Sequence, residues 1–313
     1  MMMRILFTGG SSFTGYWLIK ELTAAGHKVI ATFRRRPDQY PDKLRRQRVD
    51  ALTSICQPLF GISFGDERFI ALIKDGHFDI FCHHGADATN YRSPDFDAPL
   101  AVTRTTQQLP LVVDALLTGG CGKIIITGSV FENDEGAGSD NLRAFSPYGL
   151  SKAFTWQTFR YYAQIRHLTL GKFVIPNPFG PYEEPRFTYY LIKTWFAGQV
   201  ATVKTPLYVR DNIHVSLLAR SYVHYATSLP AGISRINPSG YVESQGTFAN
   251  RVADALRDRL GLKCALELVP QSEFSEPHIR INTDPCDAKS LDWNETAAWD
   301  EFATYYSRLM ANS

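Results

Sequence analysis

The chain has 313 residues, of which 44% are hydrophobic and 20% are charged, as expected of a folded protein with a sizeable core. Its 33 basic and 31 acidic residues give a formal charge of +2, which argues against a nucleic-acid or membrane-surface partner for the whole chain. The five cysteines are scattered and suggest neither a disulfide framework nor a zinc site. The apolar run after Met1 is too short for an export signal, so we expect a cytoplasmic protein with reduced thiols.

A strand, a tight turn and a helix are predicted at the start of the chain. Residues 4–8 form a short apolar run, the amphipathic residues 16–25 follow, and Gly26 is expected to cap this helix. The pattern of apolar and β-branched residues predicts further strands at 27–33, 61–64, 78–83, 123–127 and 172–176. Strands that alternate with helices indicate an α/β fold with a parallel sheet covered on both faces, in which ligands bind at the carboxyl ends of the strands.

Three segments interrupt this alternation. Residues 34–58 are basic and proline-containing, and we expect an exposed insertion with one short helix. Pro110 lies inside the helical run 100–117 and should start or kink a helix there. Beyond Asn177 the density of proline and glycine rises and the alternation is lost, which predicts a change of region.

The turn after the first strand has part of the spacing of a phosphate-binding loop. Gly9 and Gly15 fit the outer positions of Gly-x-x-Gly-x-x-Gly, while Ser12 occupies the middle position. Backbone N–H groups in such a turn and the following helix N-terminus favour a pyrophosphate. The motif alone leaves dinucleotide binding and an ordinary βα turn as open alternatives. The candidate cofactor-binding residues of this turn are Gly9, Ser11, Ser12, Phe13, Thr14 and Gly15.

The end of the second predicted strand distinguishes between cofactors. An acid there would accept a hydrogen bond from the ribose 2′-hydroxyl of NAD, whereas arginine pairs with the 2′-phosphate of NADP. Arg34 and Arg35 follow Phe33, and no acid occurs before Asp38, so NADP is favoured over NAD. The other arginines of this segment are expected to form a solvated basic loop: Arg36, Arg45, Arg46 and Arg48.

Tyr148 and Lys152 are four residues apart on a predicted helix that has Ser146 as N-cap and Pro147 as first residue. This spacing puts the phenol and the ammonium group on one face, where the positive charge favours phenolate and makes the tyrosine a usable acid and base. Thr127 and Ser129 end the preceding strand, so either hydroxyl could contact a substrate carbonyl oxygen.

Several other polar and aromatic residues are expected to have structural roles or to be exposed to solvent. His83 and His84 are adjacent on a strand and should point to opposite faces, which disfavours a metal site. The aromatic residues between 154 and 162 suit a core or an oligomer interface better than a platform for bases. We expect Asp134, Glu135 and Asp140 to be exposed to solvent.

These motifs occur in one order along the chain. That order, from the turn at Gly9 through Thr127 and the Tyr148/Lys152 pair to Asn177-Pro178-Phe179-Gly180-Pro181, resembles the extended short-chain dehydrogenase/reductase family. The likeness is to its nucleotide-sugar epimerases, dehydratases and ketoreductases. It implies a Rossmann-type doubly wound parallel sheet with a smaller C-terminal mixed α/β substrate-binding region. The expected NADP-binding domain comprises residues 1–176 with 207–236 returning to it, and the expected nucleotide-sugar-binding region comprises 177–206 and 237–313.

The resemblance also implies roles for single residues. Tyr148 would be the acid/base, Lys152 would lower the pKa of Tyr148 and hold the nicotinamide ribose, and Thr127 would be the catalytic hydroxyl, with Ser129 as the competing candidate. Further cofactor contacts would come from Asp66, from the backbone around His83 and Gly85, and from Pro176. The nucleotide-sugar diphosphate would be met by Asn177, Lys204 and Arg280.

The chain also departs from the family. Its dehydratases follow the threonine with Asp-Glu, which supply acid and base for water elimination; here Gly128 and Ser129 stand in those places, so dehydration is not expected. Phe131 replaces a tyrosine and Arg210 replaces an acid, and the asparagine that relatives carry near Ala101 is missing.

We therefore expect an NADPH-dependent reductase of a nucleoside-diphosphate 4-keto-6-deoxysugar, acting through Thr127, Tyr148 and Lys152 with hydride transfer. The enzymatic alternative is an NAD(P)-dependent nucleotide-sugar 4-epimerase that uses the same groups. A third hypothesis, against which the intact Tyr148 and Lys152 argue, is a non-catalytic NADP-binding protein. The resemblance further implies a homodimer that is formed through the Tyr148 helix and the helix before it.

Overall fold

The computed structural model describes residues 2–87, 91 and 93–311. The chain divides into two compact units. The first comprises Met1–Glu135, Leu142–Ile175 and Ala219–Asn237. The second comprises Gly136–Asn141, Pro176–Leu218 and Pro238–Ser313.

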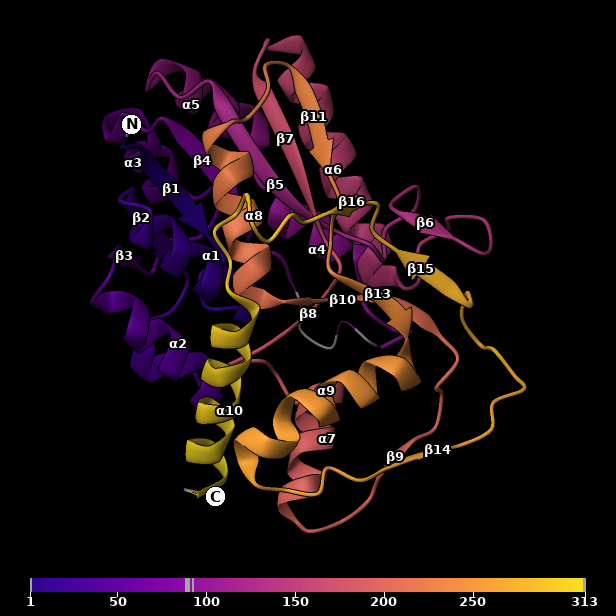
Figure 1. The fold of residues 1–313 in the computed structure, drawn as a ribbon. Helices are drawn as coiled ribbons and strands as arrows, with labels where there is room; N and C mark the ends of the chain where they lie inside the picture. Colours follow the sequence, from indigo (N-terminus) through magenta and orange to yellow (C-terminus); the bar gives the residue numbers. More distant parts are fainter. Residues whose placement is uncertain (1, 88–90, 92, 312–313) are drawn as a thin grey trace. The chain divides into compact units, whose positions relative to one another are not determined.

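The first unit is built on a parallel sheet with the strand order β11-β7-β5-β4-β1-β2-β3 (Figure 1). All neighbouring strands in it run parallel, as βαβ connections require. The strands are β1 (Arg4–Thr8), β2 (Lys28–Phe33), β3 (Gln57–Phe60), β4 (Ile80–His83), β5 (Lys123–Ser129), β7 (Thr169–Ile175) and β11 (Ile233–Ile236). This order confirms the doubly wound, Rossmann-type sheet.

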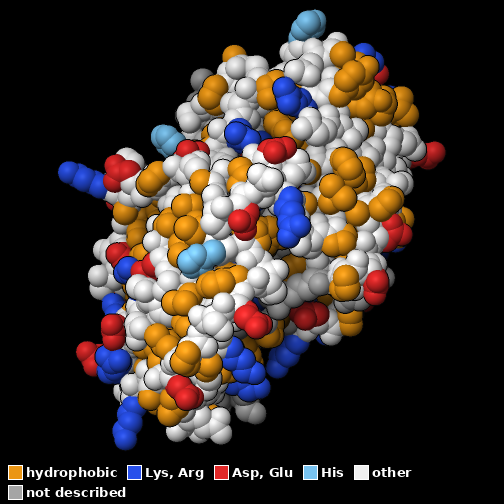
Figure 2. Space-filling view, turned by 90° about the vertical axis from the view of Figure 1, so that its right-hand side faces the viewer, with side chains coloured by type: hydrophobic (Ala, Val, Ile, Leu, Met, Phe, Trp, Pro, Cys, Tyr) orange, Lys and Arg blue, Asp and Glu red, His pale blue; other side chains and the backbone are white. Residues whose placement is uncertain are grey.

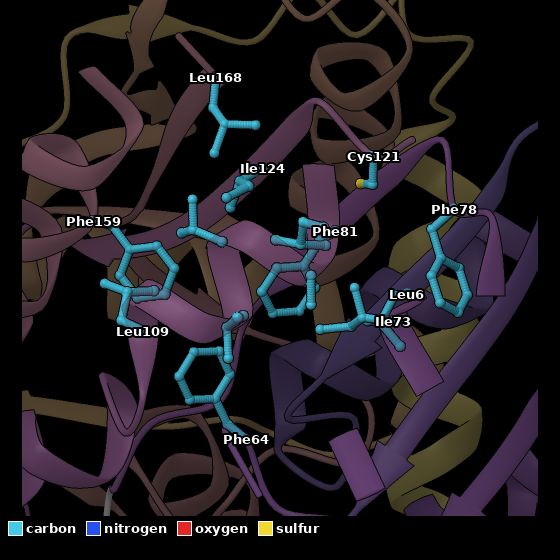
Figure 3. Packing of buried hydrophobic residues seen from close by; sticks show 14 of the residues in the cluster. Leu6, Phe64, Ile73, Phe78, Phe81, Leu109, Cys121, Ile124, Phe159 and Leu168 are labelled. Atoms are coloured by element: carbon cyan, nitrogen blue, oxygen red, sulfur yellow. The ribbon is translucent and has the colours of Figure 1, made fainter. Parts of the chain in front are cut away.

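Helices cover both faces of this sheet. One face packs on a hydrophobic cluster in which Phe81 and Ile124 from the strands meet Phe159 and other residues of the helices (Figure 3). On the other face Tyr222 packs edge-on against Phe7 and Phe173. The helices of this unit are α1 (Phe13–Ala24), η1 (Pro37–Gln39), α2 (Lys43–Thr53), α3 (Glu67–Gly76), α4 (Ala98–Thr105), α5 (Leu109–Thr118), α6 (Pro147–Ile165) and most of α8 (Val215–Thr227).

Two predicted boundaries were wrong. The third strand occupies Gln57–Phe60 and not residues 61–64. Pro58 lies within it, opposite Ala31, and is tolerated because β3 is an edge strand whose outer side needs no N–H donor. Residues 34–58 are also more than an exposed insertion, since Val49 and Leu52 of α2 are fully buried. The prediction at Pro110 is confirmed, because that residue lies in the first turn of α5 and separates it from α4.

The second unit is mixed α/β. Its largest sheet has the order β13-β10-β15-β6, with β8 also paired to β10, and contains parallel and antiparallel pairs. The strands of this sheet are β6 (Ala137–Gly138), β8 (Asn177–Phe179), β10 (Val209–His214), β13 (Tyr241–Ser244) and β15 (Ile279–Ile281). Two small sheets pair β9 (Ala201–Val203) with β14 (Leu266–Leu268) and β12 (Pro238–Ser239) with β16 (Asp284–Pro285).

The helices α7 (Phe187–Phe196), α9 (Gln245–Leu260) and α10 (Glu295–Ala311) enclose the core of the second unit. Phe179, Phe248 and Phe302 are buried there. Residues 207–218 belong to this unit, and the chain returns to the first unit at Ala219. The reason is strand pairing, since β10 bonds to β8, β13 and β15, which all belong to the second unit.

The surface carries both signs of charge. On the face drawn in Figure 2, Lys and Arg side chains are interspersed with Asp and Glu side chains, in keeping with the small net charge. Among the residues that the structure describes, no helix combines the length and the apolar character needed to cross a bilayer.

Candidate active site

The turn between β1 and α1 has the geometry of a phosphate-binding loop. Gly9 has φ +85°, and a Cβ added there would lie 2.7 Å from the backbone nitrogen of Gly85, so the turn passes directly against the end of β4. Ser12 is the N-cap of α1, and its hydroxyl accepts a hydrogen bond from Gly15 N at 3.0 Å. Ser12 therefore takes a capping role at the position where the motif has glycine.

Two N–H groups at the start of α1 are open to a ligand. Within the described part of the chain, the backbone N–H groups of Phe13 and Thr14 have no hydrogen-bond acceptor. Such groups belong to the positive end of the helix dipole and suit an anion. Gly9 and Gly15 let the turn pack against Gly85 and against itself, and the two N–H groups are of the kind that bind a dinucleotide pyrophosphate.

His84 connects this turn to the end of β5. Its Nε2 lies 3.0 Å from both Ser12 Oγ and Thr14 Oγ1, and its Nδ1 lies 2.8 Å from Thr127 Oγ1. Burial, followed by the charge of Lys152, lowers the pKa of His84 to about 3, so the imidazole is neutral. From the sequence, the His84 side chain was considered only as a metal ligand, and that role was disfavoured. The hydroxyl residues Ser12, Thr14 and Thr127 were the feature of the sequence from which their cluster around His84 could have been predicted.

His83 points to the other side of β4. Its Nδ1 lies 2.9 Å from Thr8 Oγ1 and its Nε2 lies 3.2 Å from the carbonyl oxygen of Thr105. Thr8 Oγ1 also accepts from Gly85 N at 3.1 Å. His83 thus ties β1, β4 and α4 together in the interior.

The arginines after β2 separate into two groups. Arg34 and Arg35 are exposed just beyond Phe33, and within the described residues neither forms an ion pair or hydrogen bond. Arg48 was predicted to belong to a solvated loop, which is wrong. It is 1% exposed, and its Nη1 donates to the carbonyl oxygen of Ser11 at 3.3 Å, because α2 packs on α1 and carries this side chain to the turn.

Asp66 begins α3. Its two carboxylate oxygens accept from Phe69 N and Ser63 N, each at 2.7 Å, so it is the N-cap of this helix. The residue is half-buried at the carboxyl side of β3. Its capping bonds leave one lone pair on each oxygen for a further donor.

Tyr148 and Lys152 lie on the first turns of α6. Ser146 caps this helix by accepting from Gly149 N at 3.3 Å, and Pro147 is its first residue, as predicted. The ring of Tyr148 packs edge-on against Tyr91 and Phe96. Lys152 is 7% exposed, and burial lowers the pKa of its ammonium group to about 8.

The two candidate hydroxyls at the end of β5 differ in their surroundings. Thr127 is 1% exposed and its hydroxyl is engaged with His84. Ser129 Oγ accepts from Phe131 N at 3.2 Å, and no acceptor for its own proton is found among the described residues. Both hydroxyls thus lie at the carboxyl edge of β5, and His84 bonds to that of Thr127.

A buried ion cluster lies behind this strand end. Lys172 Nζ is 2.5 Å from Glu132 Oε2 and 2.6 Å from Glu135 Oε1, and all three side chains are almost completely buried. The prediction that Glu135 is exposed was wrong, because Lys172 of β7 faces the loop after β5 and pairs with both carboxylates. The ion cluster was not predicted from the sequence. Lys172 belongs to no recognised motif, and Glu132 and Glu135 resemble ordinary charged loop residues.

The ion cluster explains the glycine at 128. A Cβ added to Gly128 would lie 2.6 Å from Lys172 Cε and 2.9 Å from Glu132 Oε1. The space that a side chain would need is therefore filled by the ion pair. Positions 128 and 129 offer no carboxyl group to this strand end.

The residues predicted to bind the substrate diphosphate lie in the second unit. Asn177 is on β8 and donates to the carbonyl oxygen of Asp211 at 3.2 Å, and Arg280 is a buried residue of β15. Both strands pair with β10, so these two residues belong to one sheet. Lys204 is exposed and directly follows β9, a strand of a different sheet. Pro176 is buried and directly precedes β8.

Known proteins show where this architecture recurs. The model of the NAD dependent epimerase/dehydratase family matches residues 5–259. No curated protein matches the chain. Among solved structures, the UDP-glucose 4-epimerase of Stenotrophomonas maltophila with bound NAD is 19% identical, with a TM-score of 0.73 and 99% of each chain covered.

Two further solved structures are similar. The UDP-glucose 4-epimerase of Thermotoga maritima is 18% identical, with a TM-score of 0.72, and the match covers 98% of this chain and all of that one. The dTDP-glucose 4,6-dehydratase of Streptomyces venezuelae, solved with NAD, is 18% identical with a TM-score of 0.71, and the match covers 99% of this chain and 98% of that one. At this identity the likeness establishes the fold. The family match spans most of the chain, from β1 to α9, and places this protein in the NAD dependent epimerase/dehydratase family.

Proposed function

We propose that this family member is an NADPH-dependent reductase of a nucleoside-diphosphate 4-keto-6-deoxysugar. The observation that carries the redox chemistry is the pair on α6, in which the buried ammonium group of Lys152 lies one helical turn from Tyr148. Its positive charge stabilises phenolate, so Tyr148 can release and recover a proton near neutral pH. The nicotinamide supplies the hydride when it is bound.

In this proposal Tyr148 protonates the oxygen of the keto group, and a hydroxyl from Thr127 or Ser129 donates a hydrogen bond to the same oxygen. Elimination of water is not part of the proposed reaction. The ion pair of Lys172 and Glu132 fills the space beside position 128. Gly128 and Ser129 stand where dehydratases carry the Asp and Glu that eliminate water.

Arg34 and Arg35 support NADPH as the cofactor. Both are exposed beyond the carboxyl end of β2, and the segment has no acid before Asp38 to bond a ribose 2′-hydroxyl. Asn177, Lys204 and Arg280 are the proposed ligands of the substrate diphosphate.

The test is the loss of NADPH absorbance when purified protein meets a panel of nucleotide-linked 4-keto-6-deoxyhexoses, with NADH in parallel. Steady oxidation of NADPH in preference to NADH, abolished by Tyr148→Phe, is the expected result. No oxidation with any sugar would overturn the reductase proposal.

A nucleotide-sugar 4-epimerase is the second candidate, because 4-epimerases with bound NAD are among the most similar structures. The same Tyr148 would then remove and return one proton within a single turnover. Interconversion of a nucleotide sugar and its 4-epimer without net use of NADPH, together with tightly held cofactor after purification, would support this candidate over the reductase.

We also propose a homodimer. Large apolar side chains are exposed on two neighbouring helices, Leu111 on α5 and Phe154 and Tyr161 on α6. Pairing with a second copy would remove this apolar area from water. Light scattering of the purified protein should give twice the monomer mass, and Phe154→Glu should reduce it.

A further inference from the structure

The ion cluster behind β5 involves charged groups that the proposed reaction does not use. Glu132 sits in the loop after β5, and Lys172 lies on the neighbouring strand β7. Glu132 Oε1 accepts from Ser129 N at 2.7 Å, while its Oε2 receives Lys172 Nζ at 2.5 Å. Both oxygens face donors, one of them a buried ammonium group, and this arrangement stabilises the carboxylate form.

Glu132 is built against the helix that carries Tyr148 and Lys152. A Cβ on Gly149 would collide with the carbonyl oxygen of Phe131 and approach Glu132 N at 3.5 Å. The first turn of α6 therefore packs on the backbone of residues 131–132. The backbone N–H of Phe145, just before this helix, also donates to the carbonyl oxygen of Phe131 at 3.0 Å.

Lys172 reaches the same helix one turn further on. Its Nζ lies 5.2 Å from the ring centroid of Trp156, which follows Lys152 by four residues and shares its face of α6. Two ammonium groups are thus buried along one side of α6. Glu132 bonds to one of them through its carboxylate, and its backbone packs on Gly149, which precedes Lys152 by three residues. Glu135, the other carboxylate, bonds to Lys172 and is shared with Arg235 and Asn237.

We infer that Glu132 is a positioning residue of the redox site, because its carboxylate compensates the buried ammonium group of Lys152. In the same structure it fixes the Ser129 turn through the Ser129 N–H. Lys172 orients Glu132 and neutralises part of its charge. The balance between the two side chains sets how much positive charge remains beside Tyr148.

The electrostatics of Lys152 agree with this geometry. Burial is the largest influence and lowers the pKa of Lys152, Glu132 raises it, and Lys172 lowers it further. Burial raises the pKa of the Glu132 carboxyl, an effect that Lys172 and Lys152 oppose. Among the described residues, the charge of Lys152 also lowers the pKa of His83 and of His84, and both imidazoles are neutral.

The inference takes its functional meaning from the proposed redox reaction, but its test needs neither substrate nor cofactor. The protein is labelled with lysine carrying ¹³C at Cε, the Lys152 resonance is assigned by its loss in Lys152→Arg, and its pKa is measured by titration. In Glu132→Gln this pKa should fall by on the order of one unit, the usual size of a single nearby charge. In Lys172→Met it should rise.

Glu135→Gln is the matched control, since it also removes a carboxylate bonded to Lys172 but not the one that contacts the Ser129 turn. In Glu135→Gln the pKa of Lys152 should stay close to the wild-type value. If Lys172→Met does not fold, the double variant Glu132→Gln/Lys172→Met removes both charges and should restore a Lys152 pKa close to the wild-type value. An unchanged pKa in Glu132→Gln, or an equal change in Glu135→Gln, would overturn the inference.

Enzyme activity gives a separate readout. A reaction that needs the Lys152 ammonium group fails as pH rises through its pKa, so the alkaline limb of the pH profile should move to lower pH in Glu132→Gln. If no sugar is reduced by the wild type, the proposed function fails while the lysine titration still decides the role of Glu132. If the wild type is active and the titrations do not differ, only the role of Glu132 fails.

Discussion

Replacing Gly9 by alanine tests whether the β1–α1 turn is the cofactor site. The new Cβ would lie 2.7 Å from Gly85 N and 2.8 Å from His84 C, and both are backbone atoms that cannot rotate away. The residue would also keep φ +85°, which costs a non-glycine residue about 1–2 kcal/mol. The turn must therefore move away from the end of β4, and its N–H groups must move with it.

Gly26→Ala is a control with the same backbone strain and no collision. Gly26 has φ +84°, and nothing lies within 4 Å of its added Cβ. We expect this control to lower the free energy of unfolding by about 1 kcal/mol and to leave the NADPH dissociation constant unchanged. Gly9→Ala should lose about 1–3 kcal/mol more, the usual cost of overpacking.

The assays are urea unfolding followed by tryptophan fluorescence and NADPH titration followed by nucleotide fluorescence. Gly9→Ala should raise the dissociation constant at least tenfold, which corresponds to about 1.4 kcal/mol. Binding by Gly9→Ala within twofold of the wild type would refute the placement of the pyrophosphate at this turn. Equal weakening in Gly26→Ala would show that general destabilisation, and not the turn, is responsible.

Three further predictions concern charge. Replacing Arg34 and Arg35 by serine should lower the preference for NADPH over NADH by about tenfold or more, measured by titration with both nucleotides; an unchanged preference would contradict the 2′-phosphate assignment. Burial raises the pKa of the Glu183 carboxyl to about 7 from its ordinary 4.5. The unfolded chain therefore ionises Glu183 first, and stability is lost as pH rises from about 4.5 through 7. Between pH 5 and pH 8 the wild type should lose about 2 kcal/mol more than Glu183→Gln in urea unfolding, and parallel pH profiles would refute this. His83 and His84, each with a pKa lowered to about 3 by burial, should show no NMR titration above pH 5, whereas a step near pH 6.5 would contradict their burial as neutral groups.

Many helices and strands of the first unit could be predicted from the local pattern of apolar residues. Period-two and period-3.6 apolar spacing predicted β1, α1 and β5 close to their observed bounds, because these periods depend only on neighbours in the chain. The cap at Ser146 and the spacing of Tyr148 and Lys152 were equally local, since one helical turn decides both.

Errors arose where a partner distant in the chain decides the outcome. Pro58 resembles a loop residue until the sheet order puts β3 at an edge, where a missing N–H costs nothing. Arg48 resembles a solvated charge until α2 packs on α1 and brings it to Ser11.

The amino-acid sequence by itself determined the alternation of strands and helices, the glycine turn and the Tyr148/Lys152 pair, all of which are encoded within a few residues. Only the tertiary structure decided that Lys172 pairs with both Glu132 and Glu135, and that His84 connects the hydroxyl of Ser12 in the β1–α1 turn to that of Thr127 on β5. The physical reason is that a buried charge or hydroxyl must find its partner across the sheet. The strand order β7-β5-β4-β1, and not spacing along the chain, sets which side chains lie within reach.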